Sequence, residues 1–193
     1  MIHELEVYAK ENKIPIMLSD GIDYLCKLIK DNNTKKILEI GSAIGYSAIR
    51  MALVSDDIMV TTIEKDDDRY HEAVKNIDKF DLGKRITLIH DDALNTKVDG
   101  QFDLIFIDAS KGNNINFFEK YKNNLSDNGI IVTDNLSFHG LVDNPELAVT
   151  RNQRGLVKRI KNFINFLDNN QEFSTEYVTV GDGISISRRK END

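Results

Sequence analysis

The stretch from Lys36 to Val54 constrains the fold most. An apolar, β-prone run, KILEI, stops at Gly41, and a helical pattern begins just after Gly45. This order predicts a strand, a glycine turn and a helix. Gly41 can adopt a positive φ and, because it lacks a Cβ atom, lets a ligand approach the backbone, while N–H groups at the start of the helix face the same space. The stretch therefore predicts a pocket of the nucleotide-binding type.

The spacing of the glycines narrows the choice of ligand. A phosphate-binding P-loop requires GxxxxGK[ST] and a dinucleotide-binding turn requires GxGxxG, and the stretch has neither pattern. It reads Glu-x-Gly-x-x-x-Gly from Glu39 to Gly45, with an acidic residue inside the strand and no lysine. This pattern fits a ligand with an amino-acid tail, such as S-adenosylmethionine (SAM), better than a polyphosphate. The alternative is a turn in which both glycines serve backbone geometry only.

Length and composition indicate one domain. Of the 193 residues, 40% are hydrophobic, so we expect a single domain over 1–193, with N-terminal helices in 1–33 and the core in 34–193. A net charge of −7 argues against a surface that is basic overall. The sequence has no apolar run of about 18 residues and does not start like a signal peptide. We therefore expect a soluble, cytoplasmic protein with no membrane partner.

Strands and helices alternate along the chain. Helices are expected at 2–12, 19–31, 66–79, 116–125 and 151–167, and further strands at 58–64, 85–90, 102–108 and 129–134. Ser19 or Asp20 is expected to cap the second helix. Residues 177–180 and 184–187 form a hairpin across Gly-Asp-Gly. The pattern predicts an α/β, doubly wound, mostly parallel sheet that ends in an antiparallel hairpin.

Acidic residues follow two of the expected strands. Glu64 ends the second strand, near the spacing of about 20 residues after the glycine turn at which an acid meets ribose hydroxyls. Its alternative role is to cap the helix that begins near Asp66. Asp91 and Ala93 follow the third strand, where an acid and a small residue suit an adenine ring, although an aspartate turn is an equally good explanation.

A second group of polar residues follows the two strands expected beside the first. Asp108 ends one of these strands and Asp134-Asn135 ends the other, so their oxygen atoms should converge in front of the glycine turn. Such hard ligands suit Mg²⁺, Mn²⁺ or Ca²⁺. Taken singly, each residue could instead form a turn or a cap. Lys111 can reach the same space, although a lysine is more commonly a solvated surface charge.

With these residues identified, the chain resembles the metal-dependent SAM O-methyltransferases that include the catechol and caffeoyl-CoA methyltransferases. The resemblance covers nearly the whole chain. It rests on the Glu39–Ser47 turn, Glu64, Ala93, the Phe106–Lys111 segment, and Asp134-Asn135-Leu136 followed by Gly140 and Val142. It implies the Rossmann-like class I methyltransferase fold with a seven-stranded sheet, and we expect a homodimer.

The resemblance also implies a role for each site residue. Contacts with SAM would come from Glu39, Gly41, Ser42, Ser47, Glu64, Asp91, Ala93 and Asp108. The metal would be held by Asp108, Asp134 and Asn135, and Lys111 would be the basic residue beside the reacting hydroxyl, so that Lys111 and Asp108 form the catalytic pair. Ser110 and Asn114 depart from the plant pattern, in which an acid and a tyrosine are common.

Among bacterial members the chain looks most like the tRNA 5-hydroxyuridine methyltransferases, which form 5-methoxyuridine at the wobble position. This resemblance makes tRNA the expected substrate. A basic face on the last long helix fits an anionic partner: Arg151, Arg154, Lys158 and Lys161. A solvated helix face explains the same pattern, and the phosphates of an acyl-CoA would also satisfy it. The alternatives are a small catechol or caffeoyl-CoA-like substrate, and a protein that keeps the fold without the chemistry.

Overall fold

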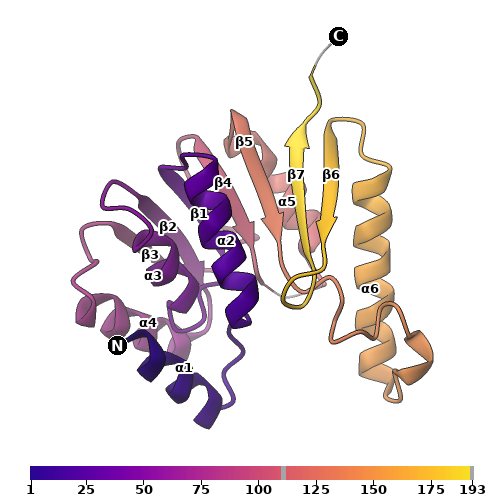
Figure 1. Cartoon of the computed structure of the whole chain (residues 1–193), viewed down its shortest axis with the longest axis horizontal. Coiled ribbons are helices and arrows are strands. Elements are labelled where there is room, and N and C mark those ends of the chain that lie inside the picture. Colours follow the sequence, from indigo (N-terminus) through magenta and orange to yellow (C-terminus); the bar gives the residue numbers. More distant parts are fainter. Residues whose placement is uncertain (110–111, 192–193) are drawn as a thin grey trace.

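A seven-stranded sheet forms the centre of the protein (Figure 1), whose computed structural model describes residues 1–109 and 112–191. The strands are β1 (Lys36–Ile40), β2 (Met59–Glu64), β3 (Ile86–His90), β4 (Phe102–Ile107), β5 (Leu125–Thr133), β6 (Phe173–Val178) and β7 (Ile184–Arg189). Their order is β3-β2-β1-β4-β5-β7-β6. Strands β1 to β5 pair in parallel, while β7 is antiparallel to both of its neighbours. The predicted doubly wound sheet with a terminal antiparallel hairpin is confirmed.

Helices cover both faces of the sheet. They are α1 (Ile2–Glu11), α2 (Ser19–Asp31), α3 (Tyr46–Ala52), α4 (Asp67–Lys79), α5 (Asn114–Tyr121) and α6 (Arg151–Asp168). Helices α1 to α4 contribute to one buried apolar cluster, and α5 and α6 contribute to a second cluster. In the part of the chain that the structure describes, no helix combines the length and the apolar character needed to cross a membrane.

Strand β4 shows why the run from Phe102 to Ile107 is almost entirely apolar. Leu104 and Phe106 belong to the cluster under α1 to α4, whereas Ile105 and Ile107 belong to the cluster under α5 and α6. Side chains alternate between the two faces of a strand, so a strand covered by helices on both faces must be apolar at every position. This double burial fixes β4 in the middle of the sheet and thereby fixes the position of Asp108 at its end.

An aromatic group joins the second layer of helices to the edge of the sheet. Phe118 on α5 makes edge-to-face contacts with Phe163, Phe166 and Phe173, with ring centroids 6.5, 5.5 and 5.1 Å away. Its side chain is fully buried. The contacts connect α5, α6 and β6, so they hold the C-terminal half of the chain against the sheet.

Four local predictions were wrong. The first strand of the hairpin, expected at 177–180, runs from Phe173 to Val178. The helix expected at 116–125 runs from Asn114 to Tyr121 and is followed by a short 3₁₀ turn, and the strand expected at 129–134 begins earlier, at Leu125. The N-cap of α2 is Leu18, which makes no side-chain capping bond. The carboxylate of Asp20 accepts instead from the backbone N–H groups of Gly21 (3.0 Å) and Gly181 (3.1 Å), because the hairpin turn lies against the start of α2.

Truncation of Phe118 tests the aromatic group. Phe118→Ala should lower the free energy of unfolding by about 3–5 kcal/mol, because the change leaves a cavity among three aromatic rings. Leu147→Ala, at a side chain that is 60% exposed, is the control and should change stability by less than about 0.5 kcal/mol. Urea titrations of the three proteins give the comparison, and equal losses for the two variants would contradict the assignment.

Candidate active site

The glycine turn lies where the strand order reverses, between β1 and β4. The Gly41 N–H donates to the carbonyl of Ile63 and the Asp108 N–H donates to the carbonyl of Ile40, each at 3.0 Å. Gly41 has a φ of 95°, and a Cβ atom added there would lie 2.5 Å from the backbone oxygen of Asp108. Only glycine therefore permits this close approach of the two strand ends. The carboxyl ends of the strands open into the region where ligands bind in such sheets.

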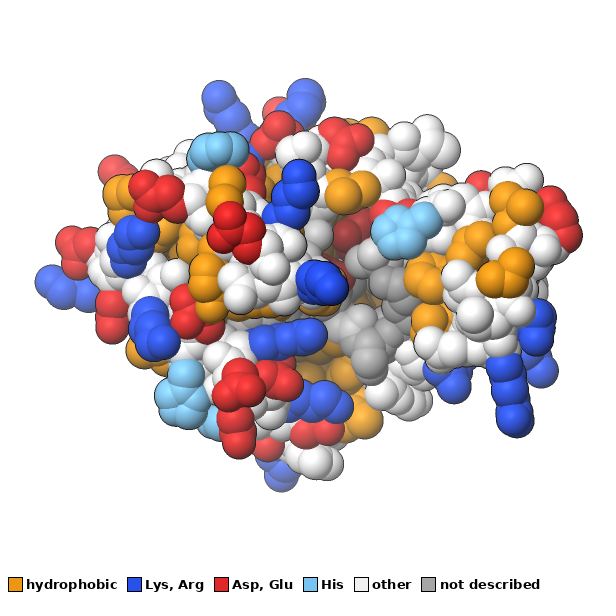
Figure 2. Space-filling model, turned by 90° about the horizontal axis from the view of Figure 1, so that it is seen from below, with side chains coloured by type: hydrophobic (Ala, Val, Ile, Leu, Met, Phe, Trp, Pro, Cys, Tyr) orange, Lys and Arg blue, Asp and Glu red, His pale blue; other side chains and the backbone are white. Residues whose placement is uncertain are grey.

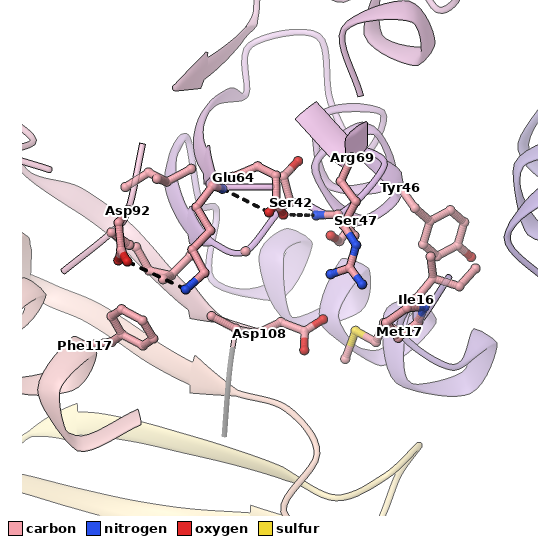
Figure 3. A pocket seen from close by; sticks show the side chains of 18 of the residues that line it. Ile16, Met17, Ser42, Tyr46, Ser47, Glu64, Arg69, Asp92, Asp108 and Phe117 are labelled. Carbon is pink, nitrogen blue, oxygen red and sulfur yellow. Dashed lines mark hydrogen bonds and ion pairs between the residues drawn. The ribbon is translucent and has the colours of Figure 1, made fainter. Parts of the chain in front are cut away.

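A cavity of about 350 Å³ occupies this region. Figure 3 shows Asp92 and Phe117 at one end, Glu64 and Ser42 in the middle, and Met17 at the other end. The volume lies within the range of about 300–1,000 Å³ that is usual for small-molecule sites. The candidate residues Gly41, Ser42, Ser47, Glu64, Asp91, Ala93, Asp108 and Asn135 all line the cavity. The structure therefore brings the candidates from five separate strand ends, those of β1 to β5, into one site.

Glu64 joins the glycine turn to the start of α4. One oxygen of its carboxylate accepts from the N–H of Ala43 at 2.8 Å, and the other accepts from the N–H groups of Lys65 and Asp66, both at 2.9 Å. The side chain is only 7% exposed, yet it lines the cavity. Asp66 is the true N-cap of α4, since its side chain accepts from the Arg69 N–H. Glu64 thus fixes the backbone around the cavity and presents its remaining acceptor capacity to a ligand.

The residues after β3 build one end of the cavity. The carboxylate of Asp91 accepts from the hydroxyl of Thr96 at 2.8 Å, so this aspartate organises its turn while it lines the cavity. The carbonyl of Ala93 accepts from the hydroxyl of Tyr121 at 2.7 Å, which ties the turn to α5. Phe117 comes from the same helix and is buried beside Ala93. This end of the cavity thus combines a small and an aromatic side chain, Ala93 and Phe117, with the carboxylates of Asp91 and Asp92.

Glu39 lies beneath the glycine turn and is completely buried. Its carboxylate accepts hydrogen bonds from the hydroxyl groups of Ser47 and Thr62, which brings β1, β2 and α3 together. Burial is the main reason that the pKa of Glu39 rises to about 7, while the two hydroxyl donors oppose this rise. Glu39 is absent from the cavity lining, whereas Ser47 is part of it. In this structure Glu39 thus supports Ser47 from below the cavity, where a direct contact of Glu39 with a ligand was expected.

At the cavity three side chains that carry oxygen atoms lie together: Asp108, Asp134 and Asn135. We call them the oxygen cluster. The side-chain amide nitrogen of Asn135 lies 3.0 Å from Oδ1 of Asp108 and 3.1 Å from Oδ2 of Asp134. Asn135 has a φ of 68°, a conformation that asparagine adopts more readily than most residues. Among the described residues no group of three His, Cys, Asp or Glu side chains could hold a metal ion. A metal at this cluster would therefore depend on the amide oxygen of Asn135 as the third ligand.

The other two sequence predictions concern Lys111 and the basic face of α6. Lys111 lies outside the described residues. The four basic side chains of the face are exposed and do not line the cavity: Arg151, Arg154, Lys158 and Lys161. The guanidinium of Arg154 donates to the carbonyls of Ala148 (3.2 Å) and Val149 (2.8 Å), which precede α6. This bonding explains a basic residue in the first turns of a helix, because Arg154 holds the incoming loop.

Several lining residues were not predicted from the sequence. Ile16 and Met17 come from the loop before α2, and Arg69 comes from the first turn of α4. Figure 3 shows the guanidinium of Arg69 directed into the cavity on the side of Ser47 and Met17. The only sequence signal was an apolar loop after Pro15 and a basic residue in the turn that follows Glu64. Their positions depend on how α2 and α4 pack, which local patterns do not encode.

The buried carboxyl of Glu39 predicts a pH-dependent stability. Its pKa is about 7 in the folded protein and ordinary in the unfolded chain, so the folded state binds the proton more tightly. The contribution of Glu39 to the free energy of unfolding should therefore fall as the pH rises from about 4.5 to 7, by at most about 1.4 kcal/mol per pH unit. Glu39→Gln removes this titration. Chemical denaturation at several pH values gives the free energy of unfolding as a function of pH. The loss with rising pH that Glu39 causes should be absent in Glu39→Gln, whereas the exposed control Glu146→Gln should show the same pH dependence as the wild type.

Comparisons with known proteins match the whole chain. A family model described as O-methyltransferase covers residues 1–190. The caffeoyl-CoA O-methyltransferase of Populus kitakamiensis is 30% identical over 94% of this chain and 81% of the relative. A Staphylococcus aureus structure, provisionally named a caffeoyl-CoA O-methyltransferase, superposes with a TM-score of 0.94 at 35% identity, covering 98% of this chain and 92% of that chain.

A second solved structure extends the comparison to a bound state. The O-methyltransferase from Bacillus cereus in complex with SAH superposes with a TM-score of 0.82 at 26% identity, covering 98% of this chain and 90% of that chain. The α/β fold with its seven-stranded, mostly parallel sheet agrees with these matches. The chain belongs to the O-methyltransferase family.

Proposed function

We propose that the protein transfers the methyl group of SAM to a hydroxyl group of a small molecule with two adjacent oxygen atoms, such as a catechol or a caffeoyl-CoA-like ester. The observation that carries this proposal is the position of Asp108, which lines the cavity and also accepts a hydrogen bond from Asn135 in the oxygen cluster. A methyl donor bound in the cavity and a methyl acceptor bound at the oxygen cluster would therefore meet at Asp108.

The names of the relatives support the small-molecule substrate. The Populus protein is named for caffeoyl-CoA, and the Bacillus cereus enzyme was solved with SAH, the product of methyl transfer from SAM. This support reverses the order of the two substrate hypotheses drawn from the sequence, in which tRNA came first. Figure 2 shows a hollow with acidic side chains inside on this face of the molecule.

The shape of the cavity supports one orientation of SAM. The end formed by Asp91, Ala93 and Phe117 suits an adenine ring, and Glu64 in the middle suits the ribose hydroxyls. Beyond Glu64 the cavity offers the hydroxyl of Ser42, which is buried and has no hydrogen-bond partner among the described residues, and then Arg69 on the side of Ser47 and Met17. A cation and an unused donor suit the carboxylate of the amino-acid tail. The methyl group would then lie near Asp108.

The oxygen cluster fits a divalent metal. The amide nitrogen of Asn135 lies within 3.1 Å of oxygen atoms of both Asp108 and Asp134, so a half-turn of that amide would bring its oxygen beside the two carboxylates, and the three groups together would hold the metal. A bound metal would hold both oxygen atoms of the acceptor and lower the pKa of the reacting hydroxyl. The two carboxylates would balance the charge there, and the buried position of Asp134 keeps them away from bulk water. As the basic residue of this proposal, Lys111 in its neutral form would accept the proton that the hydroxyl loses.

A tRNA substrate remains the second candidate because of α6. Lys158 and Lys161 are exposed on this helix and face away from the buried side chains of Ile160 and Phe163. An exposed basic face supplies the contacts that a phosphate backbone requires. The net charge of −7 and the internal bonds of Arg154 weaken this candidate, since they leave a smaller patch on an acidic protein.

The proposed orientation of SAM predicts different effects at the two ends of the cavity. Glu64→Gln should weaken the binding of both SAM and adenosine by about tenfold or more, because a charge-assisted hydrogen bond to the ribose contributes about 1.5–3 kcal/mol. Arg69→Met should weaken SAM in the same way and leave adenosine unchanged, because adenosine lacks the carboxylate. Isothermal titration calorimetry measures both ligands. Equal losses of adenosine binding in the two variants would contradict the orientation.

The proposed reaction predicts methyl transfer that depends on a divalent metal. With Mg²⁺ and SAM the protein should methylate caffeoyl-CoA or a simple catechol, and Asp134→Asn or EDTA should abolish turnover while SAM binding persists. Mass spectrometry of the acceptor and calorimetry with SAM give the two readouts. Turnover of tRNA lacking 5-methoxyuridine, with none of the small acceptors, would replace the main proposal with the second candidate. Binding of SAM without any turnover would favour a protein that has lost the chemistry.

A further inference from the structure

We propose that the turn of the β6–β7 hairpin, Gly181–Gly183, positions the oxygen cluster, and that Asp182 is the positioning residue. The inference rests on the proposed function, because it concerns the site assigned there to the metal. Asp182 lies between two strands at the opposite end of the sequence from the glycine turn. Its carboxylate is 94% buried by the fold, since the residue is only 6% exposed.

The hairpin turn holds the backbone of the segment that directly follows Asp134 and Asn135. Oδ1 of Asp182 accepts from the N–H of His139 at 2.5 Å, and the carbonyl of Asp182 accepts from the N–H of Ser137 at 2.7 Å. The carbonyl of Gly183 accepts from the N–H of Leu136 at 3.0 Å. The hairpin turn thus fixes three backbone N–H donors within four consecutive residues. The direction in which the chain leaves Asn135 is set by these bonds.

The held segment has a backbone that needs such support. Asn135, Phe138 and His139 have φ values of 68°, 48° and 56°. A left-handed conformation is unfavourable for a bulky side chain such as that of Phe138, whereas Asn and His adopt it more readily, and it persists at Phe138 only where surrounding contacts enforce it. The carboxylate of Asp182 bonds to His139, the residue that directly follows Phe138. Loss of that bond should therefore let the segment relax and carry Asn135 away from Asp108 and Asp134.

The hairpin turn also contacts the start of α2, which follows a loop that lines the cavity. The N–H of Gly181 donates to Oδ2 of Asp20 at 3.1 Å, and a Cβ atom added at Gly181 would lie 3.1 Å from Cα of Gly21. These residues begin α2, directly after the loop that brings Met17 to the cavity. On its other side, a Cβ atom added at Gly183 would lie 2.9 Å from the Ser137 nitrogen. The turn is therefore packed between the start of α2 and the segment after β5.

The charge of Asp182 matters because its surroundings offer few donors. Oδ2 of this carboxylate is buried and has no hydrogen-bond partner in the described part of the chain, and the exposed ring of His139 lies 3.6 Å from Oδ1. The negative charge strengthens the bond to the His139 N–H. An asparagine would keep the size of the side chain and weaken that bond. Asp182 does not belong to the cavity lining, so we place its effect in the backbone of the segment that it holds.

Asp182→Asn tests the inference, and Asp103→Asn is the matched control. Asp103 is also an aspartate that holds backbone N–H groups, those of Lys35 and Lys36 at 2.9 Å, but it lies at the start of β4, away from the cavity. Calorimetry measures the affinity for Mn²⁺ in the presence of SAH, and the affinity for SAH without metal. Asp182→Asn should weaken Mn²⁺ binding about tenfold or more, as is usual for residues that orient metal ligands, and leave SAH binding unchanged.

The control separates positioning from a general loss of stability. Asp103→Asn should lower the free energy of unfolding and keep the wild-type affinity for Mn²⁺. In turnover assays the Asp182→Asn enzyme should need more Mg²⁺ for half-maximal rate and regain most of the wild-type kcat at saturating Mg²⁺. Wild-type Mn²⁺ affinity in Asp182→Asn, or an equal loss in Asp103→Asn, would overturn the inference and leave the proposed function standing.

Two further outcomes are distinguishable. If the wild-type protein binds SAH and no Mn²⁺, the metal part of the proposed function fails and the inference fails with it. If Asp182→Asn does not fold, Asp182→Glu keeps the charge and moves it by one methylene group. This variant should also bind Mn²⁺ more weakly than the wild type, and wild-type affinity in it would overturn the inference.

Discussion

The close approach of β1 and β4 behind Gly41 is the constraint on which the site depends. The Asp108 N–H bonds to Ile40, and the backbone oxygen of Asp108 occupies the space that a side chain at position 41 would fill. This contact brings the ends of the two central strands together at the point where the strand order reverses. The cavity and the oxygen cluster share Asp108 for that reason. A larger residue at position 41 would separate the two strand ends and, with them, the two halves of the site.

The two acids near this turn show how similar residues acquire different tasks. Glu39 points to the face of β1 covered by α3 and is completely buried, and burial raises its pKa to about 7. Glu64 ends β2, accepts three backbone N–H groups and still lines the cavity. The difference follows from position along the strand, since an interior residue faces a layer of helices and a terminal residue faces the opening. Sequence spacing identified both acids and could not separate supporting from lining residues.

The fold was largely predictable because its signals are local and repeated. Apolar runs such as 102–107 require helices on both faces, and their alternation with helical patterns leads to a parallel sheet. The strand ends could be predicted for the same reason, which is why Asp108 and Asp134 were correctly placed side by side. The contributions of Met17 and Arg69 could not be predicted. They depend on the packing of α2 and α4 against the sheet, and this packing is decided by contacts between segments far apart in the sequence.

The wrong prediction of a cap at the start of α2 also has a physical explanation, because an aspartate can bond to a distant segment as well as to its own helix. Asp20 was expected to cap α2, but its carboxylate bonds to Gly181 of the hairpin, a partner that lies far away in the sequence.

The described lining of the cavity contains four acids and two bases: Glu64, Asp91, Asp92, Asp108, Lys65 and Arg69. Lys65 lies 3.6 Å from Asp92, so this base is partly neutralised, and the middle of the cavity keeps a negative balance near Asp108. Under the proposed function this balance favours a sulfonium cation over the neutral thioether that remains after transfer, because only the cation gains Coulomb energy from the surrounding carboxylates. The same charges that attract the methyl donor would therefore help the product to leave.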